Sequence, residues 1–150
     1  VWSEGGLSAG MWVSSGDAAM GTEYDIFAGY SGSVGELSYG ITYITYIYPS
    51  SDVLNGAGDL EEGVYSLGYG PVSLTVYDSL AGDYSYTTVG YDVGDFSLMY
   101  GVHDNGANDQ ENFDVTYSYN DSLSFTYSVP FGSTVEEAEP TFVASYSLTF

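Results

Sequence analysis

Apolar and polar residues alternate with a period of two along most of this chain. The longest such stretch is its last ten residues, Thr141–Phe150, which read T-F-V-A-S-Y-S-L-T-F. A period of two is typical of a β-strand with one apolar and one mostly polar face. Ten residues are also about what a tilted strand needs to cross the hydrocarbon of a bilayer. No stretch has helical periodicity, so the pattern predicts an all-β protein.

The same alternation predicts ten full strands joined by turn residues. They are Leu7–Ser14, Thr22–Tyr30, Leu37–Tyr48, Glu62–Gly68, Val72–Asp78, Tyr84–Tyr91, Phe96–His103, Asn112–Tyr119, Leu123–Val129 and Thr141–Phe150. Val1-Trp2 is expected to be the end of a further strand. Short turns are expected at 3–6, 31–36, 69–71, 92–95 and 120–122, and longer loops at 15–21, 49–61, 79–83, 104–111 and 130–140.

Short and long connectors therefore alternate along the whole chain. In an up-and-down antiparallel meander, all the short turns lie at one end and all the long loops at the other. Outer-membrane barrels have this arrangement. The sequence predicts one domain, residues 1–150, folded as an up-and-down antiparallel meander of about ten strands that forms a β-barrel of the outer-membrane type.

The two faces of the predicted strands differ in chemistry. In Val72–Asp78, for example, Val72, Leu74 and Val76 alternate with Ser73 and Thr75. The exposed face of a soluble sheet normally carries charges that keep its edges from pairing. Here nearly all charge lies in turns, in loops or at strand ends, and the main candidates for charges on a polar face, near a loop end, are Glu23, Asp25 and Asp114. An apolar exterior around a narrow Ser/Thr/Gly interior fits a small membrane barrel, with many of the 17 tyrosines as girdle residues.

Three large side chains, Trp12, Phe27 and Tyr46, fall on the mostly polar face and would narrow such an interior. Two other arrangements use the same faces. In a soluble barrel or sandwich, the apolar face would point inward as the core. In a self-assembling exterior protein, strands would pair between copies of the chain, because Gly/Tyr/Ser-rich strands without charge on their faces are prone to edge pairing.

The charge composition excludes several functions. The chain has 21 acidic residues and no Lys or Arg, for a formal net charge of -21 at pH 7. Recognition of a phosphate backbone needs Lys or Arg, so nucleic-acid binding is excluded, and attachment to anionic headgroups is unfavourable. A pore lined by such a chain would prefer cations. Without cysteine there is no disulfide and no zinc–thiolate site.

The sequence contains neither an apolar run long enough for a transmembrane helix nor a signal peptide at Val1. It also offers no nucleophile–base arrangement. His103 is the single histidine and lies at a predicted strand end beside Asp104, where a solvated role is the simplest interpretation. The sequence therefore predicts a protein that is not an enzyme.

Acidic loops are the better candidates for ligand binding. Asp104, Asp109 and Glu111 offer carboxylates at close spacing within 104–111, and Asp59 and Glu61 do so in the loop 49–61. Hard cations such as Ca²⁺ favour carboxylate and amide oxygens. A third acidic group lies at 136–139. The predicted metal ligands are the five carboxylates of Asp59, Glu61, Asp104, Asp109 and Glu111. Calcium is the one cofactor the sequence suggests. The alternative is that these loops are solvated and resist aggregation by charge repulsion.

Three segments add a family resemblance. They are Glu23–Gly32; Leu37–Gly40 running on to Tyr43, Tyr46, Tyr48 and Pro49; and Glu62 followed by Ser66–Leu74. In this order and spacing they resemble the proteobacterial Gcw_chp family of predicted porin-like outer-membrane barrels. Members usually have about two strands before the segment matching Val1-Trp2, so the resemblance implies that this chain lacks N-terminal strands. They also contain Lys and Arg, and the family brings no established catalytic residues.

The expected function is thus a passive or structural, porin-like barrel with acidic external loops, in the bacterial outer membrane. The alternative is an extracellular structural protein whose β-subunits assemble into filaments or sheets, with divalent cations as a candidate requirement. The expected partner is a lipid bilayer in the first case and copies of the same chain, as a homo-oligomer or polymer, in the second.

Overall fold

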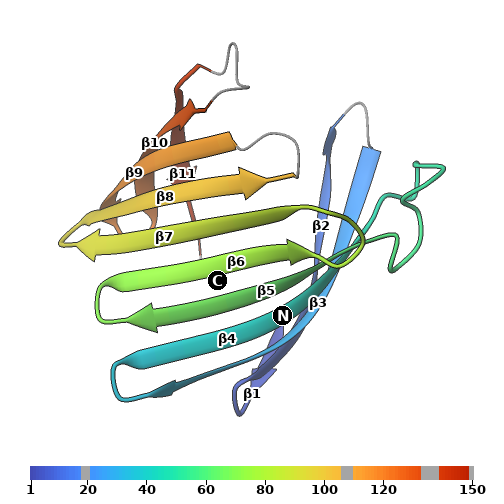
Figure 1. Cartoon of the computed structure of the whole chain (residues 1–150), viewed down its shortest axis with the longest axis horizontal. Helices are drawn as coiled ribbons and strands as arrows, with labels where there is room; N and C mark the ends of the chain where they lie inside the picture. The colour runs from blue at the N-terminus through green and yellow to red at the C-terminus, as the bar shows by residue number, and fades with distance from the viewer. Residues whose placement is uncertain (18–20, 106–109, 133–138, 149–150) are drawn as a thin grey trace.

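Eleven antiparallel strands form a single sheet in sequence order (Figure 1). The computed structural model describes residues 1–17, 21–105, 110–132 and 139–148. The strands are β1 (Trp2–Glu4), β2 (Leu7–Asp17), β3 (Gly21–Val34), β4 (Leu37–Ile47), β5 (Leu60–Tyr69), β6 (Val72–Ser79), β7 (Ser85–Val93), β8 (Phe96–Asp104), β9 (Gln110–Asn120), β10 (Leu123–Phe131) and β11 (Thr141–Tyr146). No helix in this described part could span a membrane.

The predicted all-β, up-and-down antiparallel meander is confirmed, because every strand pairs with the next one along the chain, whereas closure into a barrel stays a prediction. All ten predicted strands are present, and Trp2 does belong to a further strand, β1. In the described part of the chain β1 and β11 are the two edges of the sheet and do not pair with each other. The expected last strand, Thr141–Phe150, is shorter than predicted: β11 ends at Tyr146, Ser147 and Leu148 lie beyond it, and residues 149–150 lie outside the described part of the chain.

Several predicted loop boundaries were wrong, because pairing continues into residues that favour turns. The expected turn 31–36 contains only Gly35 and Glu36, since β3 runs on to Val34 and pairs with Leu37. The expected loop 15–21 is shorter too, because β2 continues to Asp17 and β3 begins at Gly21. Likewise, β10 continues through Phe131. Ladder pairing to a neighbouring strand thus outweighed local turn propensity at these positions.

Tight turns set one end of the sheet. Gly70 and Gly94 have φ values of 55° and 59°, in the left-handed region that glycine adopts without strain. Each lies in a two-residue connection, between β5 and β6 and between β7 and β8 respectively. Such turns match the right-handed twist of a hairpin. Figure 1 shows these short turns at one end of the sheet and the longer loops at the other.

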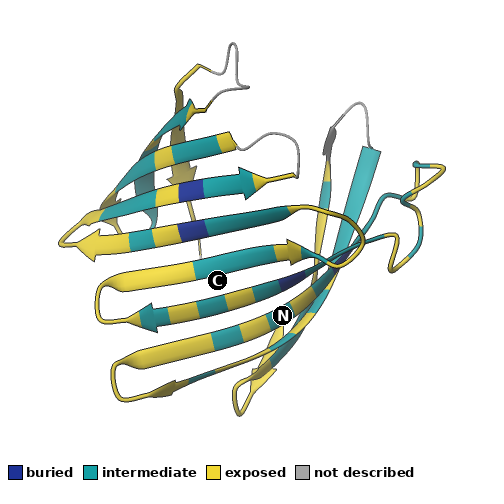
Figure 2. Cartoon of the chain, in the orientation of Figure 1, coloured by how far each residue is buried: buried dark blue, intermediate teal, exposed yellow. Residues whose placement is uncertain are grey.

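The sheet is curved, and its two faces differ in exposure. Along β5, Tyr65, Leu67 and Tyr69 are exposed, whereas Ser66 and Gly68 between them are half-buried. The same alternation runs along β3 and β4, as Figure 2 shows. Residues paired across the ladder share a face, so the apolar positions form one exposed, convex surface. The Ser/Thr/Gly positions form the more sheltered, concave face.

No large apolar side chain is buried within the described residues. Leu67 keeps 51% of its surface exposed, and Ile41 on the adjacent strand also 51%. This arrangement is the reverse of a soluble barrel or sandwich, whose apolar face would be the core. For a single copy of the chain, that alternative is therefore wrong.

Candidate functional site: the concave polar face

The half of the concave face nearest the short turns is built from small residues. Glycines alternate with hydroxyl residues on neighbouring strands, so that a Cβ on Gly40 would lie 2.7 Å from Ser66 Oγ, and one on Gly68 2.5 Å from Ser38 Oγ. This close approach lets the strands bend inward. A pocket of about 480 Å³ opens there, and its serine and threonine lining comes from Ser31, Ser33, Ser38, Ser66, Ser73 and Thr75.

The half nearest the long loops carries carboxylates and tyrosines. Tyr46 Oη donates a 2.6 Å hydrogen bond to Glu62, and Tyr48 Oη donates a 2.5 Å bond to Glu23. Asp25 lies directly opposite Tyr46 in the ladder, and its buried Oδ1 atom accepts no hydrogen bond in the described structure. Three carboxylates from β3 and β5 thus gather near one level of the concave face.

An aromatic group continues this level across the next strands. Tyr77, Tyr86 and His103 are consecutive ladder partners on β6, β7 and β8. The ring centroids of Tyr86 and His103 are 3.9 Å apart and nearly parallel, at 16°. Tyr86 Oη also donates to Asn112 Oδ1 at 3.0 Å. The stack therefore fixes the orientation of the imidazole.

Tyr84 holds the other side of His103. Its hydroxyl oxygen lies 2.7 Å from His103 Nδ1. Burial raises the pKa of Tyr84, and the charge of Glu62 adds to this shift. The phenol therefore stays neutral at ordinary pH. The prediction that His103 is simply solvated overlooked these two contacts, because nothing local in the sequence shows which tyrosines share its level.

Asp114 provides a fourth carboxylate on the same face, on β9. Its Oδ1 accepts hydrogen bonds from Ser128 Oγ at 2.5 Å and from Asn112 Nδ2 at 3.0 Å. Two residue pairs along the same ladder, the hydroxyls of Thr116 and Thr126 lie 2.8 Å apart. The concave face thus presents oxygen acceptors and hydroxyls from β3 to β10, with no lysine or arginine in the sequence to balance them.

Two more tyrosine–glutamate pairs lie on the convex face near the long loops. Tyr43 donates to Glu61, and Tyr100 Oη donates to Glu111 at 2.6 Å. Each pair joins adjacent strands at the level where the apolar surface ends. Amphipathic rings at such a boundary have one end in an apolar and one in a polar environment.

The predicted calcium ligands are distributed over separate parts of the sheet. Asp59 accepts a 2.7 Å bond from Gly56 N in the β4–β5 loop, and Glu61 is at the start of β5. Asp104 ends β8, and Glu111 lies on β9, opposite Val102 of β8. Strands β6 and β7 separate the two sets.

Asp109 lies outside the described residues, as do Glu136 and Glu137 in the third acidic group. Among the residues that are described, no three acidic or histidine side chains are arranged to hold a metal ion. The calcium site therefore stays a prediction.

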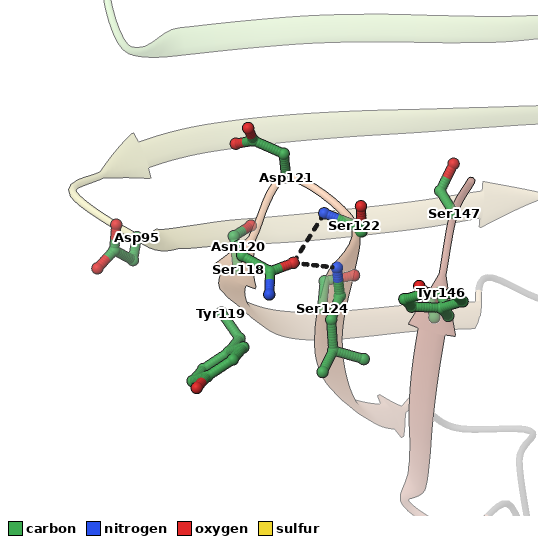
Figure 3. A pocket seen from close by; sticks show the side chains of 11 residues that line it. Asp95, Ser118, Tyr119, Asn120, Asp121, Ser122, Ser124, Tyr146 and Ser147 are labelled. Carbon is green, nitrogen blue, oxygen red and sulfur yellow. Dashed lines mark hydrogen bonds between the residues drawn. The ribbon is translucent and has the colours of Figure 1, made fainter. Parts of the chain in front are cut away.

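A second pocket, of about 460 Å³, lies at the short-turn rim between the β9–β10 turn and the end of β11 (Figure 3). Asn120 Oδ1 accepts hydrogen bonds of 2.9 Å from the backbone N–H groups of Ser122 and Leu123. The charged groups of its lining are the carboxylates of Asp95 and Asp121. It is a polar rim feature whose lining combines these carboxylates with serine and tyrosine hydroxyls.

A scan against protein-family models found no match, and searches of curated proteins and of solved structures found none either. The resemblance to the Gcw_chp family therefore depends on the three segments that carry it. Of the groups on the concave face, the sequence had pointed to Glu23, Asp25 and Asp114 as charges on a polar face. The Tyr46–Glu62 pair and the stack on His103 become visible only once the strand registers are known.

Proposed function

We propose that this chain forms the wall of a porin-like β-barrel in a bacterial outer membrane, with a passive or structural role and no catalysis. The observation that carries the proposal is the exposed apolar convex face. No other element of the described chain packs on this face, and lipid would cover it without cost. The concave face, with its hydroxyls and carboxylates, would surround water.

The charge of the concave face supports cation preference. Glu23, Asp25, Glu62 and Asp114 all face inward, and no lysine or arginine opposes them. Rings of carboxylates select cations, because they lower the electrostatic energy of a cation in a narrow aqueous passage. The three segments that resemble the Gcw_chp family agree with a porin-like barrel and with a location in the outer membrane.

Bilayer recording tests this function. The protein, refolded in detergent, is added to a planar bilayer that separates two different KCl concentrations. A reversal potential of the sign set by K⁺ supports the proposal. Anion selectivity would contradict it, and so would a chain that stays dispersed and monomeric in plain buffer without detergent.

The two open edges favour one second candidate, a self-assembling extracellular protein. Unpaired strand edges are templates for pairing with other chains, and copies could also cover the convex face. Negative-stain imaging with and without detergent separates the two. Discrete particles that need detergent support the barrel, whereas ordered polymers in plain buffer support assembly of copies.

A further inference from the structure

Both edges of the sheet leave backbone groups without strand partners. β1 pairs with β2 only at Leu7–Ala9, so within the described chain Gly10–Ser15 and Asp17, which pair with β3, have a neighbouring strand on one side alone. β11 likewise pairs only with β10. Unpaired N–H and C=O groups cost several kcal/mol each in hydrocarbon, which is why sheets cross membranes as closed barrels.

Strand direction decides which edges can close. In an up-and-down sheet, β1 and β11 run in the same direction, so joining them would create a parallel pair in a ring of eleven. Bacterial single-chain barrels have an even number of antiparallel strands. β2 runs opposite to β11, and the ring from β2 to β11 contains ten strands.

We propose that β11 pairs with the free edge of β2 in antiparallel register, with Thr141 opposite Gly16 and Tyr146 opposite Met11. β1 then stays on β2 outside the ring, as a short flap. This inference depends on the proposed barrel function, because lipid is what makes the open edges unfavourable.

The side chains along this seam complement each other in size. On the concave face, Trp12 would face Ser145, and Val143 would face Ser14. Trp12 is 52% and Val143 45% exposed. They are the large apolar side chains of the described strands that stay exposed on the concave face, and both lie on the edges that the seam would join. On the convex face, Val13 would face Ala144.

The stagger of the strands fits the same register. From Thr141, successive ladder partners across the sheet are Ser128, Asp114, Met99, Gly90, Ser73, Gly68, Ser38 and Ser33. Tyr30 pairs with Leu7, so Ser33, three residues further along β3, is level with the position that residue 4 would take if β2 were extended straight back from Leu7. Closing Thr141 onto Gly16 therefore requires a stagger of 12 residues, from 4 to 16, around the ring.

That stagger gives a realistic barrel. Twelve residues at about 3.3 Å, over ten strands about 4.8 Å apart, correspond to a strand tilt of about 40°. Outer-membrane barrels have tilts of roughly 35–45°. A register two residues lower would place Tyr146 opposite Ala9, where Trp2 already pairs. A register two residues higher would carry Thr141 beyond Asp17, the end of β2.

Engineered cysteines test the seam, because the chain has none of its own. Ser14→Cys with Val143→Cys places two thiols directly opposite each other in the proposed register. Ser14→Cys with Thr141→Cys is the matched control, two residues out of register on the same face. Both full-length variants are refolded in detergent, reconstituted in lipid vesicles and oxidised with diamide. Electrophoresis without reductant then separates monomers with an internal disulfide from covalent dimers.

We expect the Ser14/Val143 pair to form an internal disulfide at least ten times faster than the Ser14/Thr141 pair. A faster control pair would refute the register. A covalent dimer would show that a second copy supplies the strand that pairs with β2. If neither product forms, the proposed pairing of β11 with β2 is refuted. If the first pair does not fold, Trp12→Cys with Ser145→Cys tests the same register. Cation conductance of the unsubstituted protein is recorded in parallel, so a failed seam is distinguished from a failed barrel function.

Discussion

The close packing of strands on the concave face predicts that adding one methyl group, at Gly29, lowers the folding stability. Gly29 lies on β3 opposite Thr42, and a Cβ built there would lie 2.5 Å from Thr42 Oγ1, 2.8 Å from the carbonyl oxygen of Ile41 and 3.2 Å from Thr42 Cα. Two of these three atoms belong to the backbone of β4. They cannot move without disturbing the β3–β4 ladder, so Gly29→Ala must push the two strands apart.

The expected cost follows from this overlap. Overpacking of a well-packed site costs about 1–3 kcal/mol. Replacing glycine by alanine recovers about 0.4–1 kcal/mol through the unfolded chain. The net loss is therefore about 1–2 kcal/mol in the free energy of unfolding, or roughly 2–8 °C in Tm for a domain of this size.

Two other glycines serve as matched controls. At Gly90 the close atom is Ser73 Oγ, which can rotate away, and the nearest carbonyl oxygen is 3.8 Å distant. At Gly82 the nearest atom is Ser79 Oγ at 3.9 Å, so alanine fits without a shift. We expect the loss of stability to be greatest for Gly29→Ala, smaller for Gly90→Ala and absent for Gly82→Ala.

Urea titrations followed by tryptophan fluorescence measure this order, in whichever medium keeps the parent chain folded. Each variant is compared with the parent at the same detergent or lipid concentration. A Gly29→Ala variant as stable as Gly82→Ala would refute the reasoning, because β3 and β4 could not then approach as closely as the concave face requires.

Three further outcomes are expected. Leu67→Arg on the convex face should lower folding stability in lipid vesicles by about 2–4 kcal/mol if Leu67 lies near the bilayer midplane, whereas Thr75→Arg on the concave face should cost much less; equal costs in urea titrations would speak against lipid on the convex side. Glu62→Gln should reduce the K⁺ over Cl⁻ permeability ratio in bilayer recordings without reversing it, because other inward carboxylates remain, and Glu36→Gln in a short turn should leave it unchanged. If the acidic loops bind Ca²⁺, millimolar Ca²⁺ should raise Tm and EDTA should reverse the shift; a Tm insensitive to both would exclude that site.

The strands themselves could be predicted because alternation is a local signal. Val72–Ser79 shows its two faces within eight residues, and two-residue turns with glycine fix the register of hairpins such as β5–β6 and β7–β8. The side of the sheet that faces outward could not be predicted in the same way. The pattern is identical whether the apolar face is a core or an exterior, and only the curvature of the whole sheet distinguishes the two.

The site was predicted in part for a related reason. Glu23 and Asp25 stand out as charges inside an alternating strand. Tyr46 and Glu62, by contrast, look like ordinary strand residues until the β4–β5 register brings them within 2.6 Å. That register depends on the β4–β5 loop, where Tyr48 N donates to Leu54 O. Such loop geometry follows from backbone contacts that composition does not encode.

The exposed convex face forms only when the strands pair, and this affects how the unfolded chain behaves before it folds. Because polar residues and glycines interrupt the apolar ones along most strands, the unfolded chain has only short apolar runs, such as Tyr46–Tyr48, to which a membrane or a neighbouring chain could bind. The continuous apolar surface forms only when the strands pair. Until then, 21 negative charges repel one unfolded copy from another. In the proposed membrane barrel, the same alternation would keep the unfolded chain dispersed and would create the lipid-facing surface once the strands have paired.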